Sequence, residues 1–415
     1  MTAQMKLGAF LWATGHHIAA WRHPKSHVTA GIDIGHYIQL ARTAEAAKFD
    51  MIFCEDAAGL REANIGIASQ TSRSIGFEPI SLLSALAVQT SRIGLVSTAS
   101  TSYNEPYGLA RTFLSLDHLS GGRAGWNLVT SASPIEAANF GATGLKPHAD
   151  RYERAREFAE VVTGLWHGKA SGHDGHSFSV RDPLDLPRSP QGAPVMVQAG
   201  ASDVGRDLAA RTADVVFTAA QTFEEAKAFY DDLKGRMVTY GREPDDIKIM
   251  PGVSPVVAQT EAEAREKHEE LQELIPDDVG VALLSSYLSI SDLGRYPIDG
   301  PLPELPESEG MKSRQALVVE QSRRDGLSIR QLARHFAGAR GHWRIVGTAT
   351  QVADELQARF EGGAADGFNV MPSYFPGELD AFATLVVPEL QRRGLFRRDY
   401  EGRTLRDHLG LKRPA

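Results

Sequence analysis

Short apolar runs rich in β-forming residues recur along this chain, and stretches with helical periodicity separate them. This alternation is typical of parallel strands joined by crossover helices. Eight runs are predicted to be strands, at residues 7–12, 51–54, 93–97, 124–129, 195–198, 215–218, 247–257 and 367–371. Because about 250 residues suffice for a bare (β/α)8 barrel, the 415-residue chain predicts an α/β fold of the TIM-barrel type with insertions.

The segments between the predicted strands place their apolar residues on one helical face. One apolar stripe begins at Tyr152 and ends at Trp166. Near the C-terminus, Thr348 and Gln351 form a capping-box pair, which predicts a helix that continues to Phe360. The stripe that follows the first strand has members at i, i+3, i+4, i+7 and i+10, namely Tyr37, Leu40, Ala41, Ala44 and Ala47.

Two segments interrupt the alternation, and we interpret both as insertions into a single domain of residues 1–415. The larger covers about 276–344, where the Pro and Gly clusters of YPIDGPLPELPESEG break the periodicity. The smaller covers about 173–191 and carries RDPLDLPRSPQG. Long insertions in compact domains are often functional, so 276–344 is expected to line the substrate pocket and to close over a bound ligand.

Charge and cysteine content exclude several classes of function. Lys plus Arg number 44 and Asp plus Glu number 52, so the net charge of −8 gives no field that would recruit nucleic acid. The single cysteine, Cys54, cannot form an intrachain disulfide, and no Cys/His spacing indicates structural zinc. The first residues lack a signal-peptide core, and no apolar run is long enough to span a membrane. We therefore expect a soluble cytoplasmic protein without a membrane partner.

Polar residues follow the predicted strands at the ends where the active site of such a barrel lies. After the fifth strand, Gly200 permits close backbone approach, and Ala201, Ser202 and Asp203 open a helix whose free N–H groups could hold a phosphate. An equally good interpretation is that Ser202 only caps that helix. Neither GxxxxGK[ST] nor GxGxxG is present after the first strand, so an ATP or Rossmann site is not indicated.

The histidines and the strand-end side chains each allow two interpretations. The first loop carries His16 and His17 among four histidines, but no HExxH or comparable spacing supports a metal site. His148 and Tyr152 lie one helical turn apart and could face one ligand, although a structural histidine is the better interpretation of His148 alone. Asp56 could bind a ligand hydroxyl or ring N–H, or it could cap a helix. Aromatic residues at strand ends could wall a flat ligand or only fill the core; these are Trp12, Phe53 and Trp126.

Longer blocks of the sequence carry a family resemblance. They include HHIAAWRHP, ARTAEAAKFDMIFCEDAAG, LDHLSGGRAGWNLVTS, HADRYERAREFAEVVTGLW, RSPQGAPVMVQAGASDVGR and VGTATQVADELQARFEGGAADGFNVMPSYFPGELDAF. In these blocks the chain resembles the bacterial luciferase-like superfamily, specifically the subgroup of nitrilotriacetate monooxygenase component A and dibenzothiophene-sulfone monooxygenase. The blocks cover nearly the whole chain in family order.

The resemblance implies a flavoprotein of the two-component, FMN-dependent monooxygenase type. Such an oxygenase takes reduced FMN (FMNH2) from a separate NAD(P)H-dependent flavin reductase and transfers one oxygen atom of O2 to a small organic substrate. It implies homodimers or homotetramers as well. Carried over by position, the cofactor-binding residues would be Asp56, Thr98, Asn127, Ser131, His148, Tyr152, Ala201 and Ser202. His16 would be catalytic, donating a proton or hydrogen bond near the oxygen, although its neighbour His17 could point inward instead.

Three other functions stay open at this point. One is an F420- or flavin-dependent dehydrogenase of the same superfamily, which transfers hydride without O2. Another is a protein that binds flavin without catalysis, and a third is a metal-dependent hydrolase that uses the histidines of the first loop. The sequence does not identify the substrate. Arg22 is one candidate contact for an aminopolycarboxylate, or it forms a surface or structural ion pair.

Overall fold

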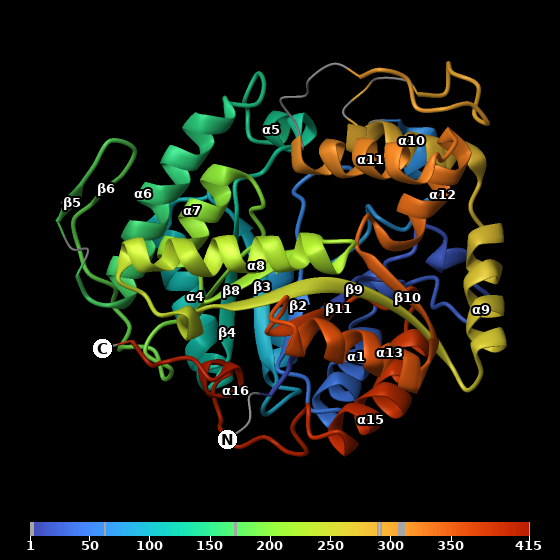
Figure 1. Ribbon diagram of the computed structural model, residues 1–415. Helices are drawn as coiled ribbons and strands as arrows, with labels where there is room; N and C mark the ends of the chain where they lie inside the picture. Colours follow the sequence, from blue (N-terminus) through green and yellow to red (C-terminus); the bar gives the residue numbers. More distant parts are fainter. Residues whose placement is uncertain are drawn as a thin grey trace.

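The computed structural model describes residues 4–61, 64–169, 172–288, 290, 293–305 and 312–414. Within these residues, eight parallel strands close into a barrel (Figure 1), and all eight predicted strands are confirmed. Around the barrel they are β1 (Lys6–Leu11), β2 (Met51–Cys54), β3 (Gly94–Ser100), β4 (Ala124–Val129), β7 (Val195–Gln198), β8 (Val215–Thr218), β9 (Lys248–Ala258) and β11 (Gly367–Val370). Because β11 pairs with β1, the ring is complete and the TIM-barrel prediction is confirmed.

Helices surround the barrel, and those predicted from periodicity are present. Thr348 and Gln351 form the expected capping box at the start of α13. The helices outside the larger insertion are α1 (Ile34–Ala46), α2 (Ile65–Ala68), α3 (Pro79–Ala87), α4 (Pro106–Ser120), α5 (Pro134–Asn139), α6 (His148–Trp166), α7 (Asp203–Thr212), α8 (Phe223–Met237), α9 (Glu261–Glu273), α13 (Ala349–Glu361), α14 (Gly377–Ala381), α15 (Val387–Arg392) and α16 (Leu405–Leu409).

Side chains alternate between the inside of the barrel and the helical layer, as strand geometry requires. Phe10, Phe53 and Phe217 meet inside the barrel, with ring centroids 4.8 to 5.7 Å apart. Trp126 points the other way and packs among the aromatic rings of α4 and α6, with its indole N–H donated to the Ala99 carbonyl. Trp126 is therefore a core residue and does not wall a ligand.

The segment 276–344 is mostly helical. It contains α10 (Asp277–Leu288), α11 (Lys312–Asp325) and α12 (Ile329–Ala339), which Figure 1 places above the barrel at the upper right. Its last residues belong to β10 (Trp343–Thr348), a strand that was not predicted and that pairs with the C-terminal half of β9. Residues 306–310 of the Pro- and Gly-rich stretch lie outside the described residues. In the smaller segment, β5 (His173–Asp174) and β6 (Ser179–Val180) form an antiparallel pair.

The C-terminal helix α16 closes the end of the barrel where the strands begin. Leu405 packs so tightly there that a Cβ on Gly94 would lie 2.3 Å from its Cδ1. Leu409 and Leu411 join the same buried cluster as the inward residues of β1, β2 and β3. The N-terminal end of the barrel is therefore filled with apolar side chains.

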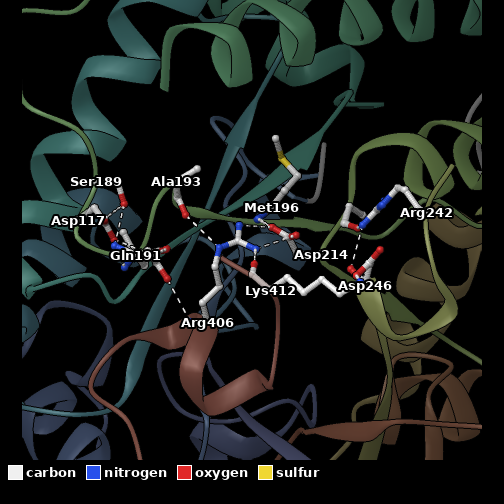
Figure 2. Close-up of polar contacts among 12 residues, drawn as sticks. Asp117, Ser189, Gln191, Ala193, Met196, Asp214, Arg242, Asp246, Arg406 and Lys412 are labelled. Carbon is white, nitrogen blue, oxygen red and sulfur yellow. Dashed lines mark hydrogen bonds and ion pairs between the residues drawn. The ribbon is translucent and has the colours of Figure 1, made fainter. Parts of the chain in front are cut away.

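A polar network surrounds this plug, and Figure 2 shows Arg406 at its centre. The Arg406 guanidinium contacts both carboxylate oxygens of Asp214, at 2.7 and 3.1 Å. Asp214 also accepts the backbone N–H of Met196 at 2.9 Å. On the other side, the Gln191 amide accepts the Arg406 backbone N–H and donates to Asp117 at 2.7 Å. Because Arg406, Asp214, Gln191 and Asp117 pair with one another, this network stabilises the closed end of the barrel.

A cluster of buried and half-buried histidines lies where the larger insertion packs on the barrel. His335 of α12 faces Arg344 of β10, with their nitrogens 3.5 Å apart. His17 of the first loop contacts Gln272 of α9. Burial, followed by the nearby positive charges, lowers the pKa of His17 to about 3 and those of His268 and His335 to about 4. The histidines are therefore neutral at pH 7, and α12 docks without charge repulsion.

None of the helices in the described part of the chain has both the length and the apolar character needed to cross a membrane.

Replacing Arg406 with Leu would leave the Asp214 carboxylate buried without its ionic partner. We expect the free energy of unfolding to fall by about 3–5 kcal/mol, measured by guanidinium denaturation. Arg265→Leu on the exposed face of α9 is the matched control, with an expected change within about 0.5 kcal/mol. Equal effects of the two substitutions would contradict the role assigned to Arg406.

The buried histidines should make the fold sensitive to acid. A base whose pKa is lower in the folded state binds fewer protons when folded, so stability decreases as the pH falls below its unfolded pKa. From the ordinary value of 6.5 and the folded values of about 3 and 4, we expect the Tm to drop between pH 6.5 and pH 4. His335→Gln should reduce this drop, whereas a Gln at the exposed His176 should not. Identical profiles of the two variants would refute the interpretation.

Candidate active site

The strand register brings the predicted site residues to neighbouring positions on one rim. Cys54 is level with Ser97, Thr98 with Asn127, and Leu128 with Gln198. The residues that follow these positions therefore emerge side by side at the C-terminal ends of β2, β3, β4 and β7. This is the rim on which TIM-barrel active sites lie.

Thr98 and Asn127 are in direct contact on the inner wall of this rim. The Asn127 amide nitrogen donates to the Thr98 hydroxyl at 2.8 Å, and that hydroxyl donates to the Cys54 carbonyl at 2.9 Å. The amide oxygen of Asn127 is buried and has no hydrogen-bond partner. Since a buried acceptor left unpaired costs about 1–3 kcal/mol, this oxygen is suited to receive a donor from a ligand.

Ser131 lies just beyond the end of β4 and is held by β3. Its hydroxyl donates to the Ser100 hydroxyl at 2.8 Å, and its backbone has a φ of 33°. A positive φ is uncommon for a residue other than glycine and is found mainly where the surroundings enforce it. The contact with Ser100 supplies such a constraint, so Ser131 is fixed at the rim.

The candidate phosphate site lies at the first turn of α7. The Ser202 hydroxyl accepts the Gly205 N–H at 3.2 Å, so Ser202 does cap the helix. A Cβ on Gly205 would lie 3.1 Å from the Ser202 hydroxyl oxygen, the Tyr152 hydroxyl oxygen and the Gly200 Cα. Tyr152 thus reaches this turn from α6, and its ring lies 4.7 Å from that of His148. Ala201 is exposed beside them. An N-terminal helical turn with hydroxyls around it suits a phosphate.

Asp56 lies apart from this group, in an open cavity of about 660 Å³ beside the ends of β1 and β2. Burial, together with the charge of Glu78, raises the pKa of Asp56 to about 6. The loop that carries Asp56 is held by α5, because the Glu136 carboxylate accepts the Ala58 N–H at 2.9 Å. A carboxyl with such a pKa is able to exchange protons near neutral pH.

The two adjacent histidines of the first loop point to different places. His16 donates its Nε2–H to the Phe10 carbonyl at 2.9 Å, and its Nδ1 faces the Arg340 guanidinium at 3.4 Å. Burial, followed by the charge of Arg340, lowers the pKa of His16 to about 3. His17 turns toward Gln272 and away from the rim. Both line a second, much smaller cavity that α10 and α12 help to enclose.

The sequence did not single out a cluster of charged residues around Trp12. The Glu55 carboxylate forms ion pairs with Arg61 at 2.5 Å and with Arg340 at 3.0 Å. Although burial opposes its ionisation, these two arginines lower the pKa of Glu55 to about 2. Both guanidinium groups lie against the Trp12 indole, 4.6 and 4.0 Å from its centroid. Only the position of Glu55 after a strand could have pointed to this cluster, because no motif marks Arg340.

Other residues of the first loop lie outside the two cavities. Arg22 stacks on Trp21, with 4.7 Å between its guanidinium carbon and the ring centroid. His23 stacks on Tyr374 at 4.0 Å. Among the residues that the structure describes, no three His, Cys, Asp or Glu side chains are grouped so as to hold a metal ion.

Comparison with known proteins identifies the family of this barrel. The family model described as luciferase-like monooxygenase matches residues 9–366. Nitrilotriacetate monooxygenase component A of Aminobacter aminovorans is 48% identical, over 99% of this chain and 97% of its own length. Dibenzothiophene-sulfone monooxygenase of Rhodococcus erythropolis is 38% identical, over 99% and 97%. Both belong to the subgroup that the sequence blocks resemble.

A solved structure agrees with these matches. The crystal structure of a riboflavin lyase with modified FMN and riboflavin has a TM-score of 0.89 to this chain and is 30% identical to it, covering 99% of this chain and 96% of its own. The agreement extends over the barrel and the segments inserted into it. The chain belongs to the luciferase-like monooxygenase family.

Proposed function

We propose that this protein is the oxygenase component of a two-component flavin monooxygenase, which uses FMNH2 and O2 to oxidise a small organic substrate. Two features at the ends of the neighbouring strands β4 and β7 support this proposal. They are the Asn127 amide oxygen, which has no hydrogen-bond partner, and the first turn of α7, which is lined by hydroxyl groups. One offers an acceptor to a polar ring, and the other offers donors to a phosphate. The names of the family relatives support the same activity.

The residues of the rim fit reduced FMN. Ser202, the N–H groups that follow it and the Tyr152 hydroxyl would hold the phosphate, with Ala201 and His148 beside them. Asn127, Thr98 and Ser131 would border the ring and the ribityl chain, and Asp56 would contact the same ligand from β2. When bound, FMNH2 supplies the two electrons that activate O2.

The protein's own part in the reaction is to bind, to orient and to exclude water. The rings of Phe10, Phe53 and Phe217 form an apolar floor below the rim. His16 is the candidate catalytic residue at this floor, and its low pKa keeps the imidazole neutral at pH 7. Both ring nitrogens of His16 have partners, the Phe10 carbonyl and Arg340, so His16 would reach the reacting atoms only by exchanging the Arg340 contact for one with the ligand.

The partners follow from this function. An NAD(P)H-dependent flavin reductase would supply FMNH2, and the cytoplasm is the compartment in which it is available. A homodimer or homotetramer is the proposed assembly. Large apolar side chains that line neither cavity are exposed between residues 28 and 65, and we propose that they contribute to the contact with a second copy; they are Val28, Ile32, Ile34, Leu60 and Ile65.

The insertion 276–344 is proposed to cover the ligand site. Its helices supply Leu283, Tyr287, Ala337 and Arg340 to the wall of the second cavity, opposite His16 and His17. A cover formed by these residues would shield reduced flavin from water and from wasteful oxidation. Part of the first loop would move with it, because the Ile18 N–H is donated to the Ala337 carbonyl at 3.0 Å.

Oxygen uptake tests the function directly. With a generic flavin reductase, NADH and FMN, we expect substrate-dependent O2 consumption above the uncoupled background. Asn127→Leu should weaken FMNH2 binding about 10-fold, the equivalent of one lost hydrogen bond to a buried group. Arg265→Gln, on the exposed face of α9, should bind FMNH2 normally. Turnover of F420 without O2 would instead identify a dehydrogenase, and flavin binding without any turnover would identify a carrier.

Limited proteolysis tests the cover. In the presence of FMN we expect tryptic cleavage within 276–344 to slow several-fold, because closure buries the peptide bonds that a protease needs exposed. Cleavage after the exposed Arg188, which contacts the Gly192 and Pro414 carbonyls ahead of β7, serves as the internal control and should not change. If FMN leaves both rates the same, the insertion does not close over the flavin.

A further inference from the structure

The aromatic floor below the rim continues beyond Phe217. The ring of His342, a buried residue, lies 5.0 Å from that of Phe217, measured between centroids. At the other end, the His16 ring lies 4.4 Å from that of Phe10, and 5.7 Å separate Phe10 from Phe217. Four rings therefore form one continuous row with an imidazole at each end.

The register of the strands directs His342 into the barrel. β8 pairs with β9 as far as Pro251, and β10 pairs with the same edge of β9 from Val253 onward. His342 directly precedes β10 and so lies level with Gly252, in the seam between the two strands. A Cβ on Gly252 would lie 2.5 Å from the His342 Nδ1 and 2.8 Å from the Phe217 Cε2. Gly252 therefore leaves the space that the imidazole fills on the inner side of the sheet.

The turn before β10 holds this imidazole in place. Arg340 and Gly341 both have a positive φ, of 55° and 75°, which reverses the chain sharply at the end of α12. The His342 N–H is donated to the Ala339 carbonyl at 2.9 Å, and the Gln221 amide is donated to the Gly341 carbonyl at 2.8 Å. The ring is thus fixed in position before any ligand arrives, as a ligand-contacting group requires.

His342 lies on the wall opposite the one that carries the proposed flavin contacts. In the ring of eight strands, β9 is four strands from β3 in either direction, and β4 is the neighbour of β3. Thr98 of β3 and Asn127 of β4 therefore face the wall at Gly252 across the floor of phenyl rings. A flat ligand ring bound at Asn127 would lie along this floor, and its far edge would meet His342. Aromatic rings favour such edge and offset contacts with one another.

We propose that His342 contacts the bound flavin ring from the β9 side, and that Gly252 is the residue that makes room for this contact. The inference rests on the proposed function and deepens it, because it adds a cofactor-contacting residue to that site. His342 is the last residue before β10 and lies only three positions after α12. The same contact would therefore link a bound flavin to the insertion that is proposed to cover it.

Nuclear magnetic resonance tests the contact in the unaltered protein. The full chain is labelled with carbon-13 at Cε1 of its 14 histidines, and FMNH2 prepared with dithionite under argon is titrated into it. The His342 signal is assigned from its absence in His342→Gln. We expect this signal to shift strongly, because an aromatic ring shifts the resonances of the nuclei that it contacts. The exposed His176 is the internal control, and its signal should stay in place.

Substitutions separate ligand contact from structural support. His342→Ala should weaken FMNH2 binding by up to about 10-fold, the range of one aromatic contact. His342→Phe should recover most of this loss, because a ring of similar size remains. Gly252→Ala should weaken binding as well, because its Cβ displaces the imidazole. Gly235→Ala on the exposed face of α8, where a Cβ meets no atom within 4 Å, is the matched control and should bind FMNH2 normally.

Three results would overturn the proposal. They are an unshifted His342 signal at saturating FMNH2, wild-type affinity in His342→Ala, and an effect of Gly235→Ala equal to that of Gly252→Ala. In all three cases the wild type still binds FMNH2, so the oxygenase function stands. Failure of the wild type to bind FMNH2 would instead remove both the oxygenase function and this contact.

Discussion

Closure of the barrel through β9 is the constraint on which the rest of the structure depends. This strand of 11 residues pairs with β8 along its first part, with β11 at its middle and with β10 along its second part. It completes the ring and then extends beyond it, where it pairs with β10, the strand at the end of the larger insertion. The barrel strands are therefore held in register by backbone hydrogen bonds, and they give a rigid base to the loops that line both cavities.

The two ends of the barrel show opposite physical characters. At the end closed by α16, Asp117, Gln191, Asp214 and Arg406 satisfy one another, and the interior is filled with leucine side chains. At the rim, the Asn127 amide oxygen is unpaired and a carboxyl has a pKa near 6. Groups left unsatisfied in an otherwise well-paired structure are expected where a ligand completes the set. Several buried polar atoms of the described residues lack a partner, and the Asn127 oxygen is distinguished by its position at the rim where TIM-barrel active sites lie.

Much of this arrangement could be predicted from the sequence because it follows local rules. The eight barrel strands, the capping box at Thr348 and the helix start at Ser202 each depend on a few adjacent residues. Strand β10 was missed because its half-exposed face carries the polar Arg344, so it does not read as an apolar run. The Trp12 cluster was missed for a different reason. Its arginines come from positions 61, 73 and 340, and only the folded chain brings them together.

The short connection between α12 and β10 has a consequence for how this family can diversify. Only residues 340–342 separate the helix from a strand that is fixed in the β9 ladder. The C-terminal end of the insertion is thus fixed by the pairing of β10 with β9, and this pairing holds Arg340 in position. Changes within residues 276–339 would therefore alter the wall that α10 and α12 give to the second cavity, and they would reach the first loop through the Ile18–Ala337 hydrogen bond.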